Sequence, residues 1–111
     1  MGESLHVRPH LVRMVYEITR DFPREELYGL TNQIRRAAVS VPSNIAEGAA
    51  RTSKKEIVQF LSVARGSLSE LETQQLLISV DLAYLDPEHV VFEKLDRVSR
   101  LVTGLQRHNA Q

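Results

Sequence analysis

Apolar residues recur three or four positions apart along almost the whole chain, which places them on one side of an α-helix. Prolines and short polar segments interrupt this pattern at three points and leave four helical segments. Apart from very short stretches, no segment alternates apolar and polar residues as a strand does. The pattern predicts an all-α protein. Short connections between long amphipathic helices favour an antiparallel, up-down-up-down four-helix bundle.

The first helix is expected to run from about Leu5 to Phe22, and Pro9 falls within its first turns. Pro23 ends it, because the residue before a proline is pushed out of the α region. Its apolar stripe consists of Leu11, Val15, Ile18 and Phe22, widened by Val12.

The second helix is expected to begin near Leu30 and to reach Arg51. Pro42 lies inside it and removes the hydrogen bond to the carbonyl of Ala38. Either the helix kinks there or it breaks into two pieces, and the apolar pattern favours the kink because it continues in phase across the proline. The residues of this inward seam are Leu30, Ile34, Ala37 or Ala38, Val41, Ile45 and Gly48.

The third helix is expected to begin after Ser53 and to end near Tyr84. Ser53 and Glu56 have the spacing of a capping box, in which each side chain accepts a hydrogen bond from a free backbone N–H. The helix carries a heptad seam with one polar member, Gln75. The seam consists of Ile57, Leu61, Ala64, Leu68, Leu71, Gln75, Ile78 and Leu82.

The fourth helix is expected to begin at Asp86-Pro87-Glu88, where Asp86 can cap and Pro87 suits the first helical position. Residues 108–111 are expected to fray. The inward seam of this helix consists of Val91, Leu95, Val98, Val102 and Leu105.

Size and composition fit one domain over residues 1–111. The 14 basic and 14 acidic residues cancel, so the chain is a poor general polyanion binder. It has no cysteine for disulfides or thiolate metal sites. No apolar run approaches the roughly 20 residues of a membrane span, and no signal peptide is evident. A cytoplasmic protein without membrane contact is expected.

The second and third helices each carry an unusual stripe on the side away from the core seam. A solvent-facing stripe is normally rich in Lys and Glu, whereas these two are small and weakly polar, and the later one turns apolar. Either the stripes form an interface between subunits, which we favour, or two central helices are buried more widely within one chain. The stripes consist of Asn32, Arg36, Val39, Ser43, Ala46 and Ala50, and of Gln59, Ser62, Gly66, Ser69, Thr73, Leu76 and Val80.

Charged and polar residues beside these stripes are candidates for contacts between subunits or with a partner. Arginine with carboxylate suits a partly buried, bidentate contact, although the same pairs could be ordinary surface pairs. The candidate groups are Arg36, Asn44, Glu47, Arg51, Glu56, Arg65, Ser67, Glu70 and Glu72. Gly48 and Gly66 are expected to permit close backbone approach, since a mid-helix glycine otherwise costs about 0.5–1 kcal/mol relative to alanine.

Residues for catalysis or cofactor binding are sparse. His6 and His10 could share a helix face, but no carboxylate completes a zinc or di-iron pattern, so surface histidines are expected. His89 is expected to be a neutral polar residue. There is no glycine-rich phosphate loop and no nucleophile elbow. The sequence predicts no enzyme, no metal site and no cofactor.

Nucleic-acid binding is the alternative function. The basic groups that favour it are Arg35-Arg36 and Arg51 with Lys54-Lys55, which a ring would repeat. Only 5% of the residues are aromatic, so a base-stacking platform is not expected.

The run QIRRAAVSVPSNIAEGAAR at residues 33–51 carries a resemblance to a known family. Together with Phe60-Leu61, residues 64–67 and residues 70–73, it closely resembles the four-helix bundle proteins encoded in intervening sequences of bacterial large-subunit ribosomal RNA genes, some of which are labelled ribosomal proteins. The resemblance implies an antiparallel four-helix bundle and a homopentameric ring. It implies no defined biochemical activity. A related branch, the accessory proteins of diversity-generating retroelements, is strongly basic and binds nucleic acid, whereas this chain has a net charge of zero.

Overall fold

The computed structural model describes the backbone of residues 2–110 and the side chains of residues 11–110. It is 84% helical and, over that part of the chain, contains no strand. The elements are α1 (Gly2–Thr19), η1 (Arg24–Glu26), η2 (Leu27–Thr31), α2 (Asn32–Ala49), α3 (Lys54–Leu76), η3 (Leu77–Asp81) and α4 (Val90–Ala110). Here η1 is a 3₁₀ turn, whereas η2 and η3 are π-helical turns. The predicted all-α, four-helix fold is confirmed.

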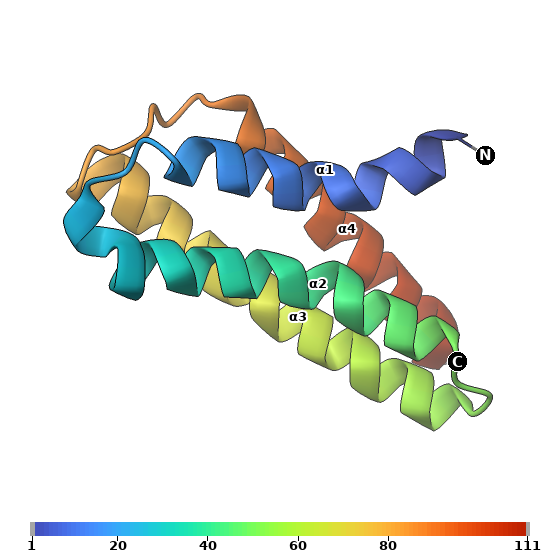
Figure 1. Cartoon of the computed structure of the whole chain (residues 1–111). Coiled ribbons are helices and arrows are strands. Elements are labelled where there is room, and N and C mark those ends of the chain that lie inside the picture. The colour runs from blue at the N-terminus through green and yellow to red at the C-terminus, as the bar shows by residue number, and fades with distance from the viewer. Residues whose placement is uncertain (1, 111) are drawn as a thin grey trace.

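The four helices form an elongated bundle in which α2 and α3 lie side by side over most of their length (Figure 1). The chain reverses direction between α1 and α2 and again between α2 and α3, and α4 crosses the others obliquely. Because α4 packs on α3 and α1 contacts both α2 and α4, the helices enclose one core. The full up-down-up-down order stays a prediction.

The core is built from the inward seams that the sequence predicts. Leu68 and Val102 have no exposed surface, and Val41 and Leu11 expose only 2% each. Other buried apolar side chains come from all four helices and from η3: Val15, Ile34, Ala37, Ala38, Leu61, Ala64, Leu71, Ile78, Val91, Leu95 and Val98. One seam residue was placed wrongly, since Leu82 is 37% exposed where the chain leaves the helix.

Helix α2 passes through Pro42 as one continuous element. Nearby side chains bond carbonyls one turn back: Ser43 Oγ donates to the carbonyl oxygen of Val39 at 2.8 Å, and Asn44 Nδ2 to that of Ser40 at 2.8 Å. A break into two pieces does not occur; the kink stays a prediction.

The connection between α1 and α2 differs in detail from the prediction. Helix α1 ends at Thr19, not at Phe22, and the Thr19 hydroxyl donates back to the carbonyl of Val15 at 2.7 Å. Phe22 then turns into the core, only 8% exposed, and its ring lies 5.3 Å from that of Tyr84. Gly29, inside η2, has the non-helical angles φ −113° and ψ −107°.

The turn from α2 to α3 is short and capped as predicted at Ser53. Its Oγ accepts a hydrogen bond from the backbone N–H of Glu56 at 3.1 Å, and Ser53 has the extended backbone of an N-cap (φ −92°, ψ 139°). The tight turn keeps α2 and α3 adjacent.

The predicted cap of the fourth helix was wrong. Asp86 Oδ1 accepts from the backbone N–H of Glu88 at 2.8 Å within a turn that precedes the helix, and α4 begins only at Val90. The side chain of His89 caps α4 instead, since its Nδ1 accepts a hydrogen bond from the backbone N–H of Val91 at 3.0 Å.

Candidate functional site

The outer stripes of α2 and α3 are exposed in the folded chain. We call these residues the assembly face; they are Asn32, Arg36, Val39, Ser43, Ala46, Ala50, Gln59, Ser62, Gly66, Ser69, Thr73, Leu76 and Val80. Leu76 and Val80 expose 63% and 66% of their surface. Wider burial within one chain is therefore wrong as an explanation of these stripes.

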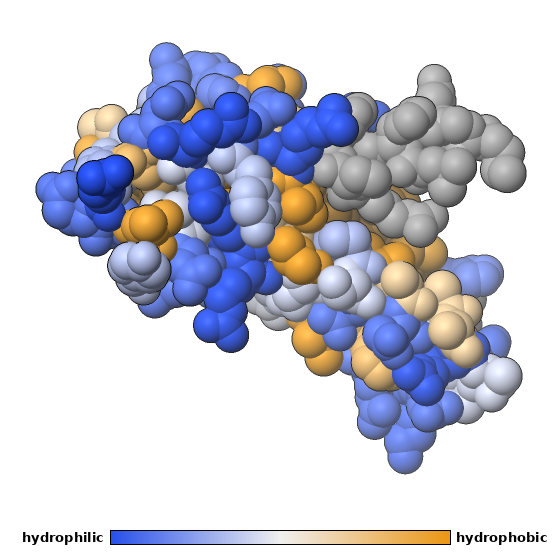
Figure 2. All heavy atoms as spheres, in the orientation of Figure 1, coloured by the Kyte–Doolittle hydropathy of each residue, from blue (hydrophilic) through white to orange (hydrophobic). Residues whose placement is uncertain are grey.

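The surface view agrees with this composition. In the orientation of Figure 2, pale and orange residues interrupt the hydrophilic coat in the region of α2, rather than leaving a continuous charged face. Leu76, the last residue of α3, and Val80, in η3, are each more than half exposed, and their spacing of four positions places them on one side of the helix.

The two glycines predicted to allow close approach differ. A Cβ added to Gly48 would lie 3.2 Å from the Cβ of Phe60, so Gly48 lets α2 and α3 approach within one chain. A Cβ added to Gly66 would meet nothing within 4 Å. Gly66 thus has no role in close packing inside the chain, and its expected role between chains stays a prediction.

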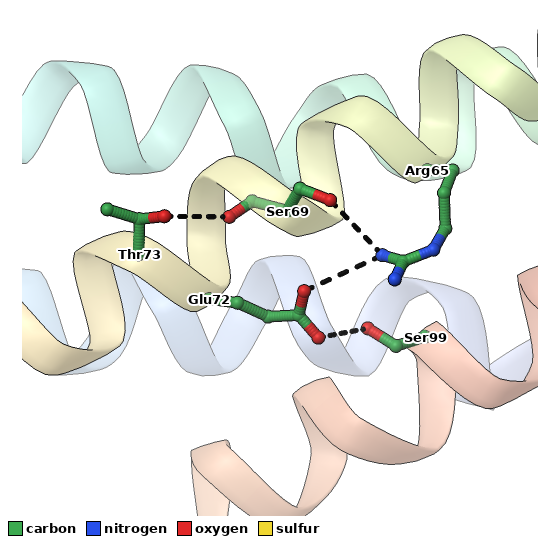
Figure 3. A network of polar contacts seen from close by, with 5 residues as sticks. All are labelled: Arg65, Ser69, Glu72, Thr73 and Ser99. Atoms are coloured by element: carbon green, nitrogen blue, oxygen red, sulfur yellow. Dashed lines mark hydrogen bonds and ion pairs between the residues drawn. The ribbon is translucent and has the colours of Figure 1, made fainter.

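Arg65 and Glu72 belong to a polar network between α3 and α4 (Figure 3). Their charged atoms lie 3.5 Å apart, Arg65 Nη1 also donates to Ser69 Oγ at 3.3 Å, and Ser99 Oγ donates to the second oxygen of Glu72 at 3.3 Å. Both charged side chains are about two-fifths exposed, so the ion pair contributes about 1 kcal/mol at most. The network joins two helices of the same chain.

Three hydroxyl and amide groups meet where α2 and α3 pack. Ser67 Oγ donates to Ser40 Oγ at 2.8 Å, and Asn44 Nδ2 approaches the same oxygen at 3.0 Å. All three residues are half-buried. Of the predicted recognition groups, Asn44 and Ser67 therefore contact partners inside the chain.

Arg51 is also engaged inside the chain. It forms an ion pair with Glu47, one turn earlier, and its guanidinium carbon lies 5.1 Å from the ring centre of Phe60.

Glu56 takes part in the cap of α3, and Glu70 accepts a hydrogen bond from Gln74 Nε2 at 3.1 Å. Arg36 alone among the predicted charged groups is exposed without a partner in the part of the chain whose side chains are described.

A cluster that the sequence did not reveal lies at the corner where α1, η1, η2 and α2 meet. Arg35 Nε donates to Thr19 Oγ1 at 2.8 Å, and its guanidinium carbon stands 4.7 Å from the ring centre of Tyr16. A pocket of about 290 Å³ opens beside them. Arg35 and Thr19 are 16 positions apart and belong to different helices, so the sequence around either residue does not predict their contact.

Across the same end of the bundle, the hydroxyl of Tyr84 donates to Glu26 Oε2 at 2.8 Å. This hydrogen bond, followed by partial burial and the charges of Glu26 and Glu25, raises the pKa of Tyr84 above its ordinary value of 10.0. The contact holds the α1–α2 connection against the α3–α4 connection.

Among residues 11–110, whose side chains the structure describes, no three His, Asp or Glu side chains are placed to hold a metal ion. The side chains of His6 and His10 lie outside the described residues. A second cavity, of about 30 Å³, lies in the core and is lined mainly by apolar side chains with Gln74 and Gln75.

No helix in the described chain has both the length and the apolar character needed to span a bilayer.

Residues 9–104 match the family model described as 23S rRNA-intervening sequence protein. No curated protein matches the chain.

Proposed function

The chain belongs to the 23S rRNA-intervening sequence protein family, and from that premise we propose that it is a cytoplasmic, non-enzymatic protein that forms a homo-oligomeric ring and acts through assembly and partner interaction. The observation that carries this proposal is the exposure of the assembly face on α2 and α3. Five copies is the number that the resemblance of residues 33–51 implies.

Burial between copies would remove an unfavourable exposure. Leu76 and Val80 present apolar surface to water, and each square ångström of apolar area buried contributes roughly 25 cal/mol. The small residues that precede them along the stripe, Ser62, Gly66 and Ser69, allow a neighbouring helix to approach closely.

The two stripes differ from each other, which suits a head-to-tail arrangement. If the α2 stripe of one copy contacts the α3 stripe of the next, the contact joins two different surfaces, and such a contact closes into a ring when the rotation between neighbouring copies divides a full turn evenly. Arg36 supplies an exposed cation on the α2 side, and Glu70 supplies an exposed carboxylate on the α3 side. Their opposite charges suit a contact between neighbouring copies.

Gly66 provides the test, and Gly104 provides a matched control. Both are exposed glycines inside helices, and at both an added Cβ would meet nothing within 4 Å of the same chain. Gly66→Leu and Gly104→Leu should therefore affect the isolated fold similarly. Light scattering after size exclusion should give a ring mass for wild type and Gly104→Leu and a lower mass for Gly66→Leu. An unchanged mass for Gly66→Leu would contradict the proposed interface.

Nucleic-acid binding is the second candidate function. It is supported by the exposed basic residues Arg36, Lys54 and Lys55, which lie on or next to the assembly face and would recur around a ring. Binding of this kind weakens steeply with salt because counterions are released. The absence of RNA binding at low salt would remove this candidate.

A further inference from the structure

The pocket at the α1–α2 corner has an unusual lining. Its volume of about 290 Å³ lies at the lower end of the range for small-molecule sites. Three arginines line it, Arg20, Arg24 and Arg35, and no carboxylate does. The lining therefore carries three positive charges in a chain whose net charge is zero.

A buried hydroxyl in the same lining lacks a hydrogen-bond partner. Thr31 is only 2% exposed, and its Oγ1 has no partner among the described residues. Buried hydroxyls almost always have a partner, since leaving one unpaired costs free energy. Thr31 belongs to the pocket lining, so a ligand that displaces the side chains covering this hydroxyl would supply that partner.

The arginines are available to an anion. Arg35 uses Nε on Thr19 and stacks on Tyr16, which fixes its guanidinium group. Arg20 and Arg24 are exposed, and their side chains form no ion pair or hydrogen bond with the described part of the chain.

The acidic residues of this corner lie outside the pocket lining. Asp21, Glu25 and Glu26 lie close in sequence, but none lines it, and Glu26 accepts a hydrogen bond from Tyr84. The opening therefore presents cationic donors.

We propose that this pocket binds the phosphate group of a small ligand, with Arg20, Arg24 and Arg35 as the cationic donors and Thr31 as a buried hydroxyl partner. Phosphate fits because guanidinium groups form paired, charge-assisted hydrogen bonds with its oxygens. The pocket has room for a phosphate and part of the group attached to it. A mononucleotide, which carries a phosphate on a compact attached group, is therefore a suitable probe.

Titration calorimetry on the full chain tests this with four probes: inorganic phosphate, adenosine 5′-monophosphate, adenosine, and a short RNA with a 5′-hydroxyl. Inorganic phosphate and the mononucleotide should bind, and adenosine should not. Binding of the RNA alone would overturn the small-ligand proposal and favour an RNA backbone as the source of phosphate.

Variants localise the site. Arg20→Gln and Arg24→Gln should each weaken mononucleotide binding about 10-fold, whereas Arg97→Gln, at an exposed arginine of α4 outside the lining, should leave it unchanged. Thr31→Val should weaken binding several-fold without lowering the thermal unfolding midpoint of the free protein. Equal weakening by Arg97→Gln, or wild-type binding by all three pocket variants, would overturn the proposal.

This inference is independent of ring formation. A folded Gly66→Leu variant should bind the mononucleotide as the wild type does, whatever its mass. The two proposals can therefore fail separately.

Discussion

Gly48 of α2 faces Phe60 of α3 so closely that a Cβ added to the glycine would stand 3.2 Å from the Cβ of Phe60. The carbonyl oxygen of Ile57 would be 3.5 Å away. The two helices thus make their close approach near the α2–α3 turn at a position where only hydrogen occupies the space.

Gly48→Leu is expected to destabilise the chain by about 1–2 kcal/mol, because overpacking costs roughly 1–3 kcal/mol and improved helix propensity offsets part of it. Urea unfolding measures the change. Gly104→Leu has open space around it and should be neutral or stabilising. If the two variants were equally stable, α2 and α3 would be able to move apart around the larger side chain at position 48 with no loss of stability.

Ala83 is expected to limit the stability of the α3–α4 connection. It is the one non-glycine residue with positive φ in the described chain, at 55°, a conformation that costs an L-residue roughly 1–2 kcal/mol. Ala83→Gly should raise the free energy of unfolding by about 0.5–1 kcal/mol. Ala50 also follows a helix but has φ −85°, so Ala50→Gly should give no gain. If Ala83→Gly lowered the free energy of unfolding as much as Ala50→Gly, this explanation would be refuted.

Gln74 is expected to cost stability. It is 7% exposed, its Oε1 has no partner among the described residues, and it lines the core cavity of about 30 Å³. Gln74→Leu should raise the free energy of unfolding by about 1 kcal/mol, since an unpaired buried polar atom costs roughly 1–3 kcal/mol and the lost bond to Glu70 returns part of that. Gln75→Leu, at the half-buried neighbour, should change stability less. Chemical denaturation of both variants gives the comparison.

Tyr84 is expected to make stability depend on pH in alkaline solution. Its pKa is raised in the folded chain, chiefly by the hydrogen bond to Glu26, so the folded state holds this proton more tightly than the unfolded state. The resulting stabilisation is complete below pH 10 and is lost as pH rises through the folded pKa. Between pH 9 and pH 11 the thermal unfolding midpoint should therefore fall more for the wild type than for Tyr84→Phe. Parallel curves would assign the effect to other groups.

The sequence predicted the core well because apolar spacing is a local property of each helix. Ile34, Val41, Leu68 and Val102 were all expected inside, and all are buried. Helix ends were predicted less well. Asp86 has a side chain that can cap a helix. However, His89 is the residue that caps α4, because the helix begins only after the turn that contains Asp86.

Side-chain partners were predicted poorly because they depend on how helices face each other. Gln75 was taken as the polar member of the α3 seam, whereas Gln74 is the more buried. Glu72, a candidate for contact between subunits, instead accepts from Ser99 of α4. Arg20, Arg24 and Thr31 resemble ordinary helix-end residues in the sequence, and only the folded corner gathers them around one pocket.

The short turn between α2 and α3 also bears on the order of events during folding. Helices joined by a few residues meet with little loss of chain entropy, so the α2–α3 hairpin is expected to form early, before α1 and α4 dock on it. Both stripes of the assembly face belong to that hairpin. Copies could therefore begin to associate before either is fully folded, and refolding should become slower and less complete as protein concentration rises.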